Sequence, residues 1–197
     1  MESANLQPAE TANARLAAPC VLVLASGRGE RFVASGGSGS KLHAMLAGKP
    51  VIEHTLAAVR ASGLPYHLED KGHEGMGDSI AAAVRATSQA AGWLILPADL
   101  PLIRPETLCA VAAALRDHAV VQPYYWGVRG HPVGFGSSCG EALMQLKGPE
   151  GAKAVLRAQL ALAPAAELHL DDVGIVTDID TMPDLAAAER LLRPAQV

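Results

Sequence analysis

Short apolar segments alternate with helix-like segments along most of the chain, and this alternation constrains the fold more than any other feature. The apolar segments are nearly continuous in Val, Leu and Ile, as strands are when both faces of a sheet are covered. Between them lie prolines that suit a first helical turn, capping aspartates and helix-ending glycines. Strands are predicted at residues 20–25, 66–69, 93–97, 119–122, 132–135 and 167–170, and helices at 51–61, 78–90, 106–117, 138–146, 151–159 and 184–192.

This order of elements predicts an α/β fold built from βαβ units, with a mostly parallel sheet and helices on both faces. We expect one domain over residues 19–197, preceded by a disordered leader over residues 1–18. In sheets of this kind, ligands bind at the carboxyl ends of the strands. Side chains that follow the predicted strands are therefore the first candidates for a functional site.

The stretch after the first predicted strand is rich in glycine and carries three cations. Residues 26–41 read SGRGERFVASGGSGSK, in which Arg28, Arg31 and Lys41 are the cations. Glycine lets backbone N–H groups approach an anion closely, so a phosphate chain is the predicted ligand. The stretch is not a Walker A loop, because it lacks Gly-Lys followed by Ser or Thr. It is not a dinucleotide fingerprint either, because Phe32 stands at the third glycine position and a Gly/Ser tract follows instead of a helix.

Bulk properties exclude several classes of partner. Half of the 197 residues are apolar and the formal net charge is -4, which argues against a nucleic acid as the main partner. No apolar run approaches the roughly 20 residues of a membrane span, so no membrane partner is expected. The three cysteines (Cys20, Cys109 and Cys139) have neither metal-ligand nor disulfide spacing, which predicts a cytoplasmic protein. A basic loop on a mildly acidic chain suits a small anionic ligand.

Asp99 is the clearest candidate for a metal ligand. It lies just past the predicted strand 93–97, between two prolines that stiffen the turn. We expect it at the same sheet edge as the basic loop. In proteins, Mg²⁺ is often held by one or two carboxylates, with waters and substrate phosphates completing its shell. The competing interpretation is an aspartate that only caps a helix or a turn.

Three weaker motifs add to the candidate site. Residues 75–79 (GMGDS) enter a helix, whose free N–H groups can bind an anion or a polar ligand edge, although most such segments are only turns. Asp178 and Asp180 share one face in an extended chain and are candidate metal ligands or solvated turn residues. Arg129 and His131 could bind a second anion, whereas a histidine before a proline is more often structural.

Taken in order, five motifs resemble those of the molybdenum cofactor cytidylyltransferase-like nucleotidyltransferases. They are LASGRGERF with its later Lys, GMGDS, PADLPL, RGHPVGF and DIDTMPDL, and they span residues 21–192. The resemblance implies a three-layer α/β/α, Rossmann-like nucleotidyltransferase fold. It implies Mg²⁺-dependent transfer of a nucleotidyl group from an NTP, CTP above all, to a phosphorylated small-molecule acceptor such as molybdopterin, with release of pyrophosphate. A molybdoenzyme maturation protein is a further implied partner.

The resemblance also implies a role for each motif. Arg31, Lys41 and Asp99 would be the catalytic residues, with the two cations neutralising the pyrophosphate. The ionised acceptor phosphate needs no strong base, so alignment and charge neutralisation dominate. The implied nucleotide-binding residues are Ala25, Ser26, Gly27, Arg28, Gly29, Gly75, Met76 and Ser79, and the implied metal ligand is Asp99. From their own motifs, we expect Arg129 and His131 to bind the acceptor and Asp180 to be a second metal ligand.

Three departures from the family pattern keep the substrate open. Ser26 stands where the guanylyl-transferring branch tends to have glycine, which favours CTP over GTP. The tract 33–40 enlarges the loop, and we expect it to be poorly ordered without ligand. The segment 59–75 holds one predicted strand, where the family usually has more chain. Two alternatives stay open. One is a related NTP transferase that uses GTP or that has a sugar-phosphate or phospholactate acceptor. The other is a non-catalytic nucleotide-binding maturation module.

Overall fold

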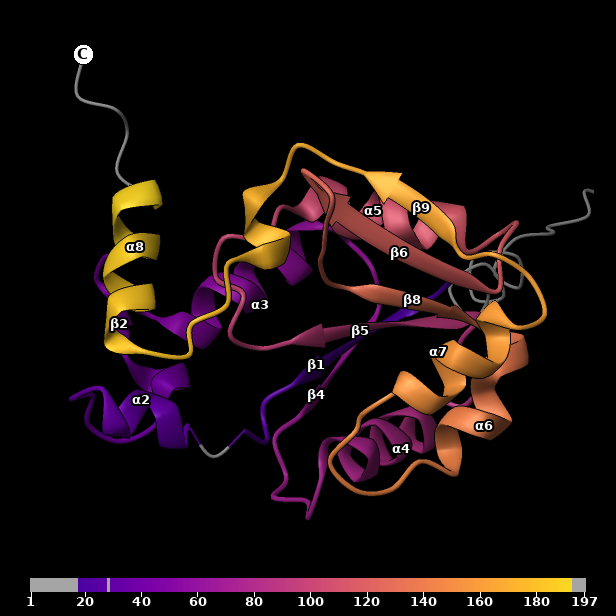
Figure 1. Cartoon of the computed structure of the whole chain (residues 1–197), viewed down its shortest axis with the longest axis horizontal. Helices are drawn as coiled ribbons and strands as arrows, with labels where there is room; N and C mark the ends of the chain where they lie inside the picture. Colours follow the sequence, from indigo (N-terminus) through magenta and orange to yellow (C-terminus); the bar gives the residue numbers. More distant parts are fainter. Residues whose placement is uncertain (1–17, 28, 193–197) are drawn as a thin grey trace, which may run out of the picture.

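The computed structural model describes residues 18–27 and 29–192, and its centre is a seven-stranded sheet (Figure 1). The strands follow the order β4-β1-β5-β8-β6-β7, and β9 pairs with β6. A separate two-stranded sheet joins β2 (Met45–Leu46) to β3 (Lys49–Pro50). The bounds of the main strands are β1 Cys20–Leu24, β4 Tyr66–Glu69, β5 Gly92–Pro97, β6 Val120–Tyr125, β7 Val128–Arg129, β8 Val133–Gly136 and β9 Ala166–His169.

The main sheet is mostly parallel. β1 runs parallel to both β4 and β5, and β6 runs parallel to β9. β8 lies antiparallel between β5 and β6, and β7 is a short antiparallel return from β6. The α/β fold predicted from the alternation of elements is confirmed.

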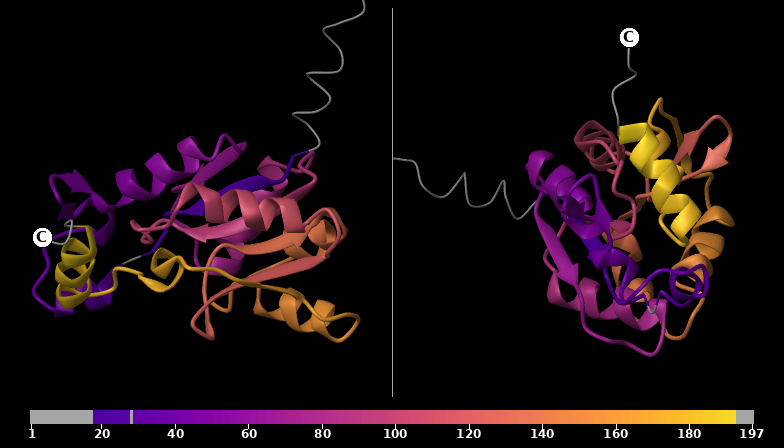
Figure 2. Two further views of the ribbon diagram at one scale, coloured as in Figure 1. Left: turned by 90° about the horizontal axis from the view of Figure 1, so that it is seen from above. Right: turned by 90° about the vertical axis from the view of Figure 1, so that its left-hand side faces the viewer.

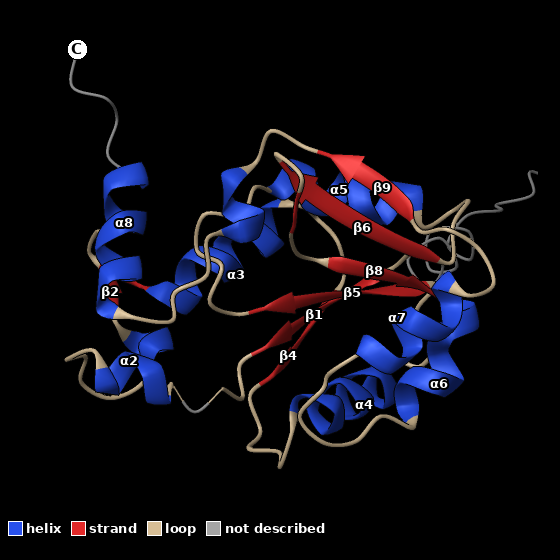
Figure 3. Cartoon of the chain, in the orientation of Figure 1, coloured by secondary structure: helices blue, strands red, loops and turns tan. Residues whose placement is uncertain are grey.

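Helices cover both faces of the sheet, as Figure 3 shows. They are α3 Val51–Ala61 and α5 Pro105–Ala114 on one face, and α4 Met76–Ala86, α6 Gly140–Met144 and α7 Lys153–Leu160 on the other. Alternate residues of β1 enter the two cores: Val23 packs in the first, and Leu22 and Leu24 pack in the second. Because both faces are buried, the strand is apolar at every position.

Segments that are far apart in the sequence form a small lobe at one end of the sheet (Figure 2). The lobe contains α2 (Glu30–Ala34), the 3₁₀ turn η1 (Lys41–His43), the β2–β3 pair and α8 (Met182–Leu192). It has a hydrophobic core of its own, made of Phe32, Leu46, Val51, Ile179 and Ala188. The lobe therefore joins the loop after β1 to the last helix that the structure describes.

The helix α2 follows the glycine-rich loop directly. No helix was expected there, and that expectation was wrong for residues 30–34. The reason is Phe32, which is 1% exposed and packs in the core of the lobe. Its ring lies so close to Gly37 that a Cβ there would be 2.2 Å away, which explains one glycine of the tract. Ser35 Oγ accepts a hydrogen bond from the N–H of Met182 at 2.9 Å. The poor order expected for residues 33–40 without ligand stays a prediction.

Most other predicted elements are present with shifted ends. α4 begins and ends earlier than the predicted helix 78–90, and α5 ends three residues before the predicted end at residue 117. The predicted helix 138–146 is divided into the 3₁₀ turn η2 (Ser137–Cys139) and α6. Another 3₁₀ turn, η3 (Val173–Val176), precedes α8. Between α3 and α4 the chain forms only β4, at the sheet edge, which confirms the single strand predicted there.

Within the described residues, no helix combines the length and the apolar character needed to cross a bilayer. The predicted leader lies outside the described residues except for Ala18. The assignment of residues 19–197 to one domain stays a prediction.

Candidate active site

A cleft of about 610 Å³ opens at the carboxyl ends of β1, β4 and β5. Residues of all five sequence motifs line it. Three of the motifs follow strands that end at the same edge of the sheet. The predicted site residues that line it are Ser26, Gly27, Arg31, Lys41, Gly75, Met76, Asp99, Arg129, His131 and Asp180. The structure thus brings these residues together, while their individual roles stay predictions.

The other predicted nucleotide-binding residues lie elsewhere. Ala25 donates its N–H to the carbonyl of Glu69 at 2.9 Å, which holds the end of β1 against the end of β4. Gly29 lines an adjoining hollow of about 270 Å³. Ser79 is 1% exposed and lies behind the cleft wall. Arg28 lies outside the described residues.

Ser79 contacts the cleft through Ser26. Their hydroxyl oxygens are 2.7 Å apart, and Ser79 also donates to the carbonyl of Gly75 at 3.2 Å. These hydrogen bonds tie the loop after β1 to the start of α4. A Cβ on Gly75 would lie 2.3 Å from the backbone of Gly148, so no larger residue fits at this turn. The first glycine of the GMGDS motif therefore has a packing reason in addition to any role with a ligand.

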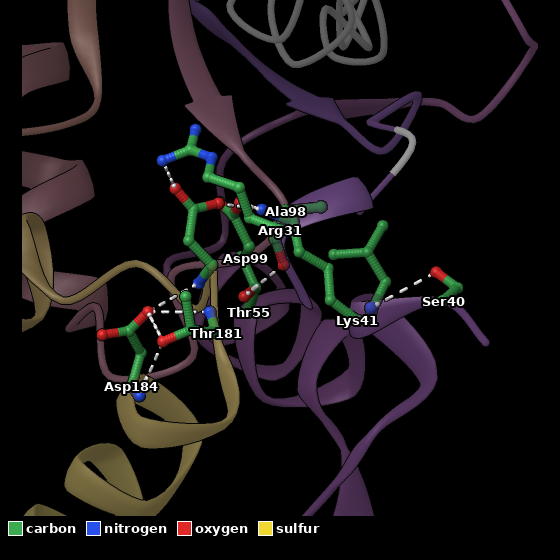
Figure 4. A network of polar contacts seen from close by, with 10 residues as sticks. Arg31, Ser40, Lys41, Thr55, Ala98, Asp99, Thr181 and Asp184 are labelled. Atoms are coloured by element: carbon green, nitrogen blue, oxygen red, sulfur yellow. Dashed lines mark hydrogen bonds and ion pairs between the residues drawn. The ribbon is translucent and has the colours of Figure 1, made fainter. Parts of the chain in front are cut away.

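Two cations and two aspartates form the charged centre of the cleft, and Figure 4 shows the polar contacts around it. Lys41 Nζ lies 2.5 Å from Asp99 Oδ2 and 2.6 Å from Asp180 Oδ1. Arg31 Nη1 lies 2.7 Å from Asp180 Oδ2, although the Arg31 side chain is 78% exposed. Burial by itself lowers the pKa of Lys41, but the two carboxylates outweigh this effect and the pKa is raised. Lys41 is therefore a charged ammonium at neutral pH.

Main-chain and capping contacts hold the second aspartate beside the first. The N–H of Ile179 donates to the carbonyl of Asp99 at 3.0 Å, which lays the segment before α8 against the end of β5. Asp184 Oδ2 accepts from the N–H groups of Asp180 at 3.2 Å and Thr181 at 2.7 Å. Thr181 Oγ1 accepts in return from the N–H of Asp184 at 3.3 Å. These contacts form a reciprocal cap at the start of α8.

Among the described residues, one carboxylate oxygen of Asp99 has no partner. Its turn is fixed from α3, because Thr55 Oγ1 donates to the carbonyl of Ala98 at 2.9 Å. Oδ2 contacts Lys41, whereas Oδ1 is buried and has no hydrogen-bond partner among the described residues. An unsatisfied buried acceptor is costly, and each such group in a native structure needs an explanation. A cation ligated by Oδ1 would remove the cost.

The donor set suits a metal that arrives with phosphates. Within the described residues, no three His, Cys, Asp or Glu side chains converge to hold a metal by themselves. Mg²⁺ needs only one or two carboxylates when waters and substrate phosphates fill the rest of its shell. Asp99 and Asp180 fit that requirement.

Asp178 and His131 also line the cleft. Burial raises the pKa of Asp178, and the neighbouring carboxylates of Asp180 and Asp99 raise it further. Burial lowers the pKa of His131 despite the attraction of Asp99 and Asp178. His131 is therefore neutral at pH 7 and supplies no positive charge for a second anion, although it can still form a hydrogen bond.

Arg129 lies on β7 at the rim of the cleft. Its Nε donates to the hydroxyl of Tyr124 at 3.1 Å, and the Tyr124 ring stacks on His169 with centroids 5.5 Å apart. Behind it, Gln122 Nε2 donates to the carbonyl of Gly130 at 2.7 Å. The Arg129 side chain is exposed but anchored, as a residue that meets an incoming anion would be.

A polar cluster that was not predicted from the sequence lies around the end of β4. Glu69, at the end of β4, has a side chain that is 5% exposed. It accepts hydrogen bonds from His73 Nε2 at 3.1 Å, His67 Nε2 at 3.3 Å and the N–H of Lys71 at 3.3 Å. Burial opposes ionisation, but these hydrogen bonds outweigh it and lower the pKa of Glu69. His73 lines the cleft, and its spacing of four from Glu69, just before the GMGDS motif, was the available signal.

Comparisons with known proteins agree with the fold and the motifs. Residues 58–165 match the family of the MobA-like NTP transferase domain. The chain is 30% identical over 156 residues to the purine catabolism protein PucB of Bacillus subtilis, a match that covers 72% of this chain and 75% of that protein.

Solved structures show the same fold. A nucleotidyl transferase from Methanothermobacter thermautotroptrophicus matches with a TM-score of 0.69 and 18% identity, over 88% of this chain and 97% of that one. The molybdopterin-guanine dinucleotide biosynthesis protein A of Archaeoglobus fulgidus matches with a TM-score of 0.54 and 19% identity, over 87% and 97%. The family match covers just over half of the chain and includes the GMGDS, PADLPL and RGHPVGF motifs. The chain therefore belongs to the MobA-like NTP transferase family and is a nucleotidyltransferase.

Proposed function

We propose that this nucleotidyltransferase uses Mg²⁺ to transfer a cytidylyl group from CTP to molybdopterin, with release of pyrophosphate. The observation that carries the proposal is the charged centre, in which Lys41 and Arg31 meet Asp99 and Asp180 where the glycine-rich loop ends. Such a site can hold a triphosphate and a divalent ion. Among the described residues that line it there is no cysteine, and the Ser26 hydroxyl is hydrogen-bonded to Ser79 instead of to a base. The site suits a reaction in which the acceptor supplies the nucleophile.

In this reaction the phosphate oxygen of the acceptor attacks the α-phosphorus of CTP, and the bond to the β-phosphate oxygen breaks. The acceptor is already ionised at neutral pH, so the residues must mainly align two anions and offset their repulsion. Lys41 and Arg31 would stabilise the charge that develops on pyrophosphate. The loop backbone from Gly27 to Gly29 would hold the phosphates in line.

Asp99 and Asp180 would hold the Mg²⁺ ion. The buried Oδ1 of Asp99, which has no partner among the described residues, is the specific support for this assignment. When bound, the ion would neutralise phosphate charge and hold the two reactants together.

The choice of CTP is supported by Ser26. Its hydroxyl oxygen is hydrogen-bonded to that of Ser79 at 2.7 Å, so the side chain is fixed at the wall of the cleft. A glycine there, as the guanylyl-transferring branch tends to have, would leave more room for a purine. A pyrimidine needs less space beside Gly75 and Met76.

The acceptor would lie on the side of Arg129 and His131. Arg129 would contribute positive charge, and neutral His131 a hydrogen bond. Molybdopterin is supported by the resemblance of the motifs, and a protein with this fold carries molybdopterin in its name. A molybdoenzyme maturation protein would receive the product. The free cysteines at positions 20, 109 and 139 agree with a cytoplasmic location.

The test is pyrophosphate release by the purified chain with Mg²⁺, molybdopterin and each NTP in turn. We expect turnover with CTP to exceed turnover with GTP. A folded protein that turns over no NTP with molybdopterin contradicts the proposal.

A related transferase with another acceptor is the second candidate. It is favoured by β4, which stands alone between α3 and α4, where the family usually has more chain. A panel of sugar phosphates and phospholactate, each with CTP and GTP, separates the two. Turnover with one of these acceptors in place of molybdopterin would favour the second candidate.

A further inference from the structure

The ammonium of Lys41 lies between the two carboxylates proposed as metal ligands. Its Nζ is 2.5 Å from Asp99 Oδ2 and 2.6 Å from Asp180 Oδ1. The three side chains are 11%, 15% and 21% exposed, so solvent screens their charges only in part. Lys41 therefore offsets one of the two negative charges that would attract a divalent ion.

A divalent ion and this ammonium compete for the same two aspartates. Mg²⁺ binds carboxylate oxygens at about 2.0–2.1 Å, so an ion on Asp99 would lie within a few ångströms of Lys41 Nζ. Two cations at that range repel each other strongly in a partly buried site. Displacing Lys41 alone would leave a buried ammonium without a partner, which is also costly.

A triphosphate changes the balance, because it gives Lys41 other anionic oxygens. The hollow next to the cleft is lined by two cations, two carboxylates and two glycines of the loop: Arg31, Lys41, Glu30, Asp180, Gly27 and Gly29. Phosphate held by that loop would lie within reach of Lys41. The aspartates would then be released for the metal.

We propose, on the basis of the proposed function, that Lys41 is a competing counter-ion that couples metal binding to nucleotide binding. It weakens the binding of a divalent ion alone and moves to the triphosphate when the two bind together. By linkage, the nucleotide raises the affinity for the metal and the metal raises the affinity for the nucleotide by the same factor. The metal–triphosphate complex is then the form that the site accepts.

The test is binding of Mn²⁺ alone to the whole chain without nucleotide, followed by electron paramagnetic resonance of the free ion. Lys41→Met removes the charge and keeps an unbranched side chain. We expect it to bind Mn²⁺ at least about fivefold more tightly than the wild type, the lower end of the usual range for coupled ligands. Lys41→Arg keeps the charge and should leave the affinity near the wild-type value.

Arg31→Met is the matched control. Arg31 also pairs with Asp180, but its side chain is 78% exposed, so removing its charge should raise the Mn²⁺ affinity less than Lys41→Met does. Two results overturn the proposal. One is a folded Lys41→Met protein that binds Mn²⁺ no more tightly than the wild type, and the other is an equal gain from Arg31→Met.

A second measurement needs no variant. Reductive methylation of the wild type, read by peptide mass spectrometry, should label Lys41 slowly without Mn²⁺ and faster at saturating Mn²⁺. The whole Lys41 residue is 8% exposed, and the exposed Lys49 is the internal reference. A Lys41 labelling rate that does not change at a Mn²⁺ concentration at which the resonance shows the ion bound to the chain overturns the proposal.

The two failures are distinguishable. Wild-type turnover of CTP together with a negative Lys41 result rejects the coupling and leaves the proposed function standing. Absence of turnover with every NTP and acceptor rejects the proposed function, and the coupling falls with it.

Discussion

Glu69 is the last residue of β4 and Asp99 follows β5; the two strands end at the same edge of the sheet, but the surroundings of the two carboxylates differ. Glu69 has a donor on each oxygen: His67 on one, and His73 with the N–H of Lys71 on the other. Asp99 has Lys41 on one oxygen and no partner on the other among the described residues. A satisfied buried carboxylate holds its loop in place, whereas a half-satisfied one has a cost that a ligand can remove. From this contrast we expect Glu69 to support the structure of the cleft and Asp99 to act in its chemistry.

The two clusters also differ in where their partners come from. The donors to Glu69 lie within four residues of it, so the cluster forms with its own loop. Lys41 and Asp180 reach Asp99 from segments that the small lobe joins. The charge at the chemical site therefore depends on packing far from it.

The largest expected effect is that of Asp99→Asn. The variant keeps the shape of the side chain but removes the charge that would hold the metal, so kcat/KM should fall about 10²- to 10³-fold. Pyrophosphate release with CTP and molybdopterin measures it. Lys41 keeps Asp180 as a partner, so thermal unfolding should change little. Near-normal turnover by this variant would contradict the catalytic role proposed for Asp99 and the contrast with Glu69.

Glu69→Gln should produce the opposite result: a loss of stability with kcat largely retained. The amide cannot accept on both sides as the carboxylate does, and the free energy of unfolding should fall by about 1–3 kcal/mol. Urea denaturation measures this. Glu53→Gln is the matched control, because Glu53 pairs with Arg60 on an exposed helix face and should cost less than about 1 kcal/mol. Equal losses from the two variants would contradict the role given to Glu69.

The pH dependence of stability sharpens the same point. The pKa of Glu69 is lower in the folded protein than its ordinary value of 4.5. Its contribution is therefore fully present above the unfolded pKa and is lost as the pH falls through the folded pKa. The stability difference between the wild type and Glu69→Gln should shrink as the pH is lowered below 4.5. Urea titrations at a series of pH values measure this, and a difference that grows at low pH would show the wrong sign.

The smallest expected effect comes from Ser79→Ala, which removes the hydrogen bond between the start of α4 and Ser26 in the loop after β1. The loss of stability should be about 1 kcal/mol. The KM for CTP should rise while kcat changes little, because Ser26 would no longer be fixed at the cleft wall. The exposed Ser88→Ala is the control and should change neither quantity. A fall in kcat without a change in KM would place Ser79 with the Asp99 cluster instead.

Much of the site could be predicted because it follows strand ends. β1 and β5 are apolar runs, and parallel neighbours end at one edge, so Asp99 and the basic loop had to meet there. The helix α2 could not be predicted from its own residues. Phe32 needs Leu46 and Ile179, from distant parts of the chain, to bury its ring. The Glu69 cluster could not be predicted, because two histidines near a glutamate in the sequence do not show that the end of β4 buries the glutamate between them.

The sequence by itself determined the α/β class, the functional edge of the sheet and the kinds of charge found there. These follow from burial periodicity and strand direction, which are local properties of the chain. Only the tertiary structure decided which charges meet. Lys41 was predicted to bind phosphate, and the folded chain pairs it with Asp99 and Asp180. The reason is physical: Coulomb energy depends on distance in space and on burial, and both are set when the small lobe packs on the end of the sheet.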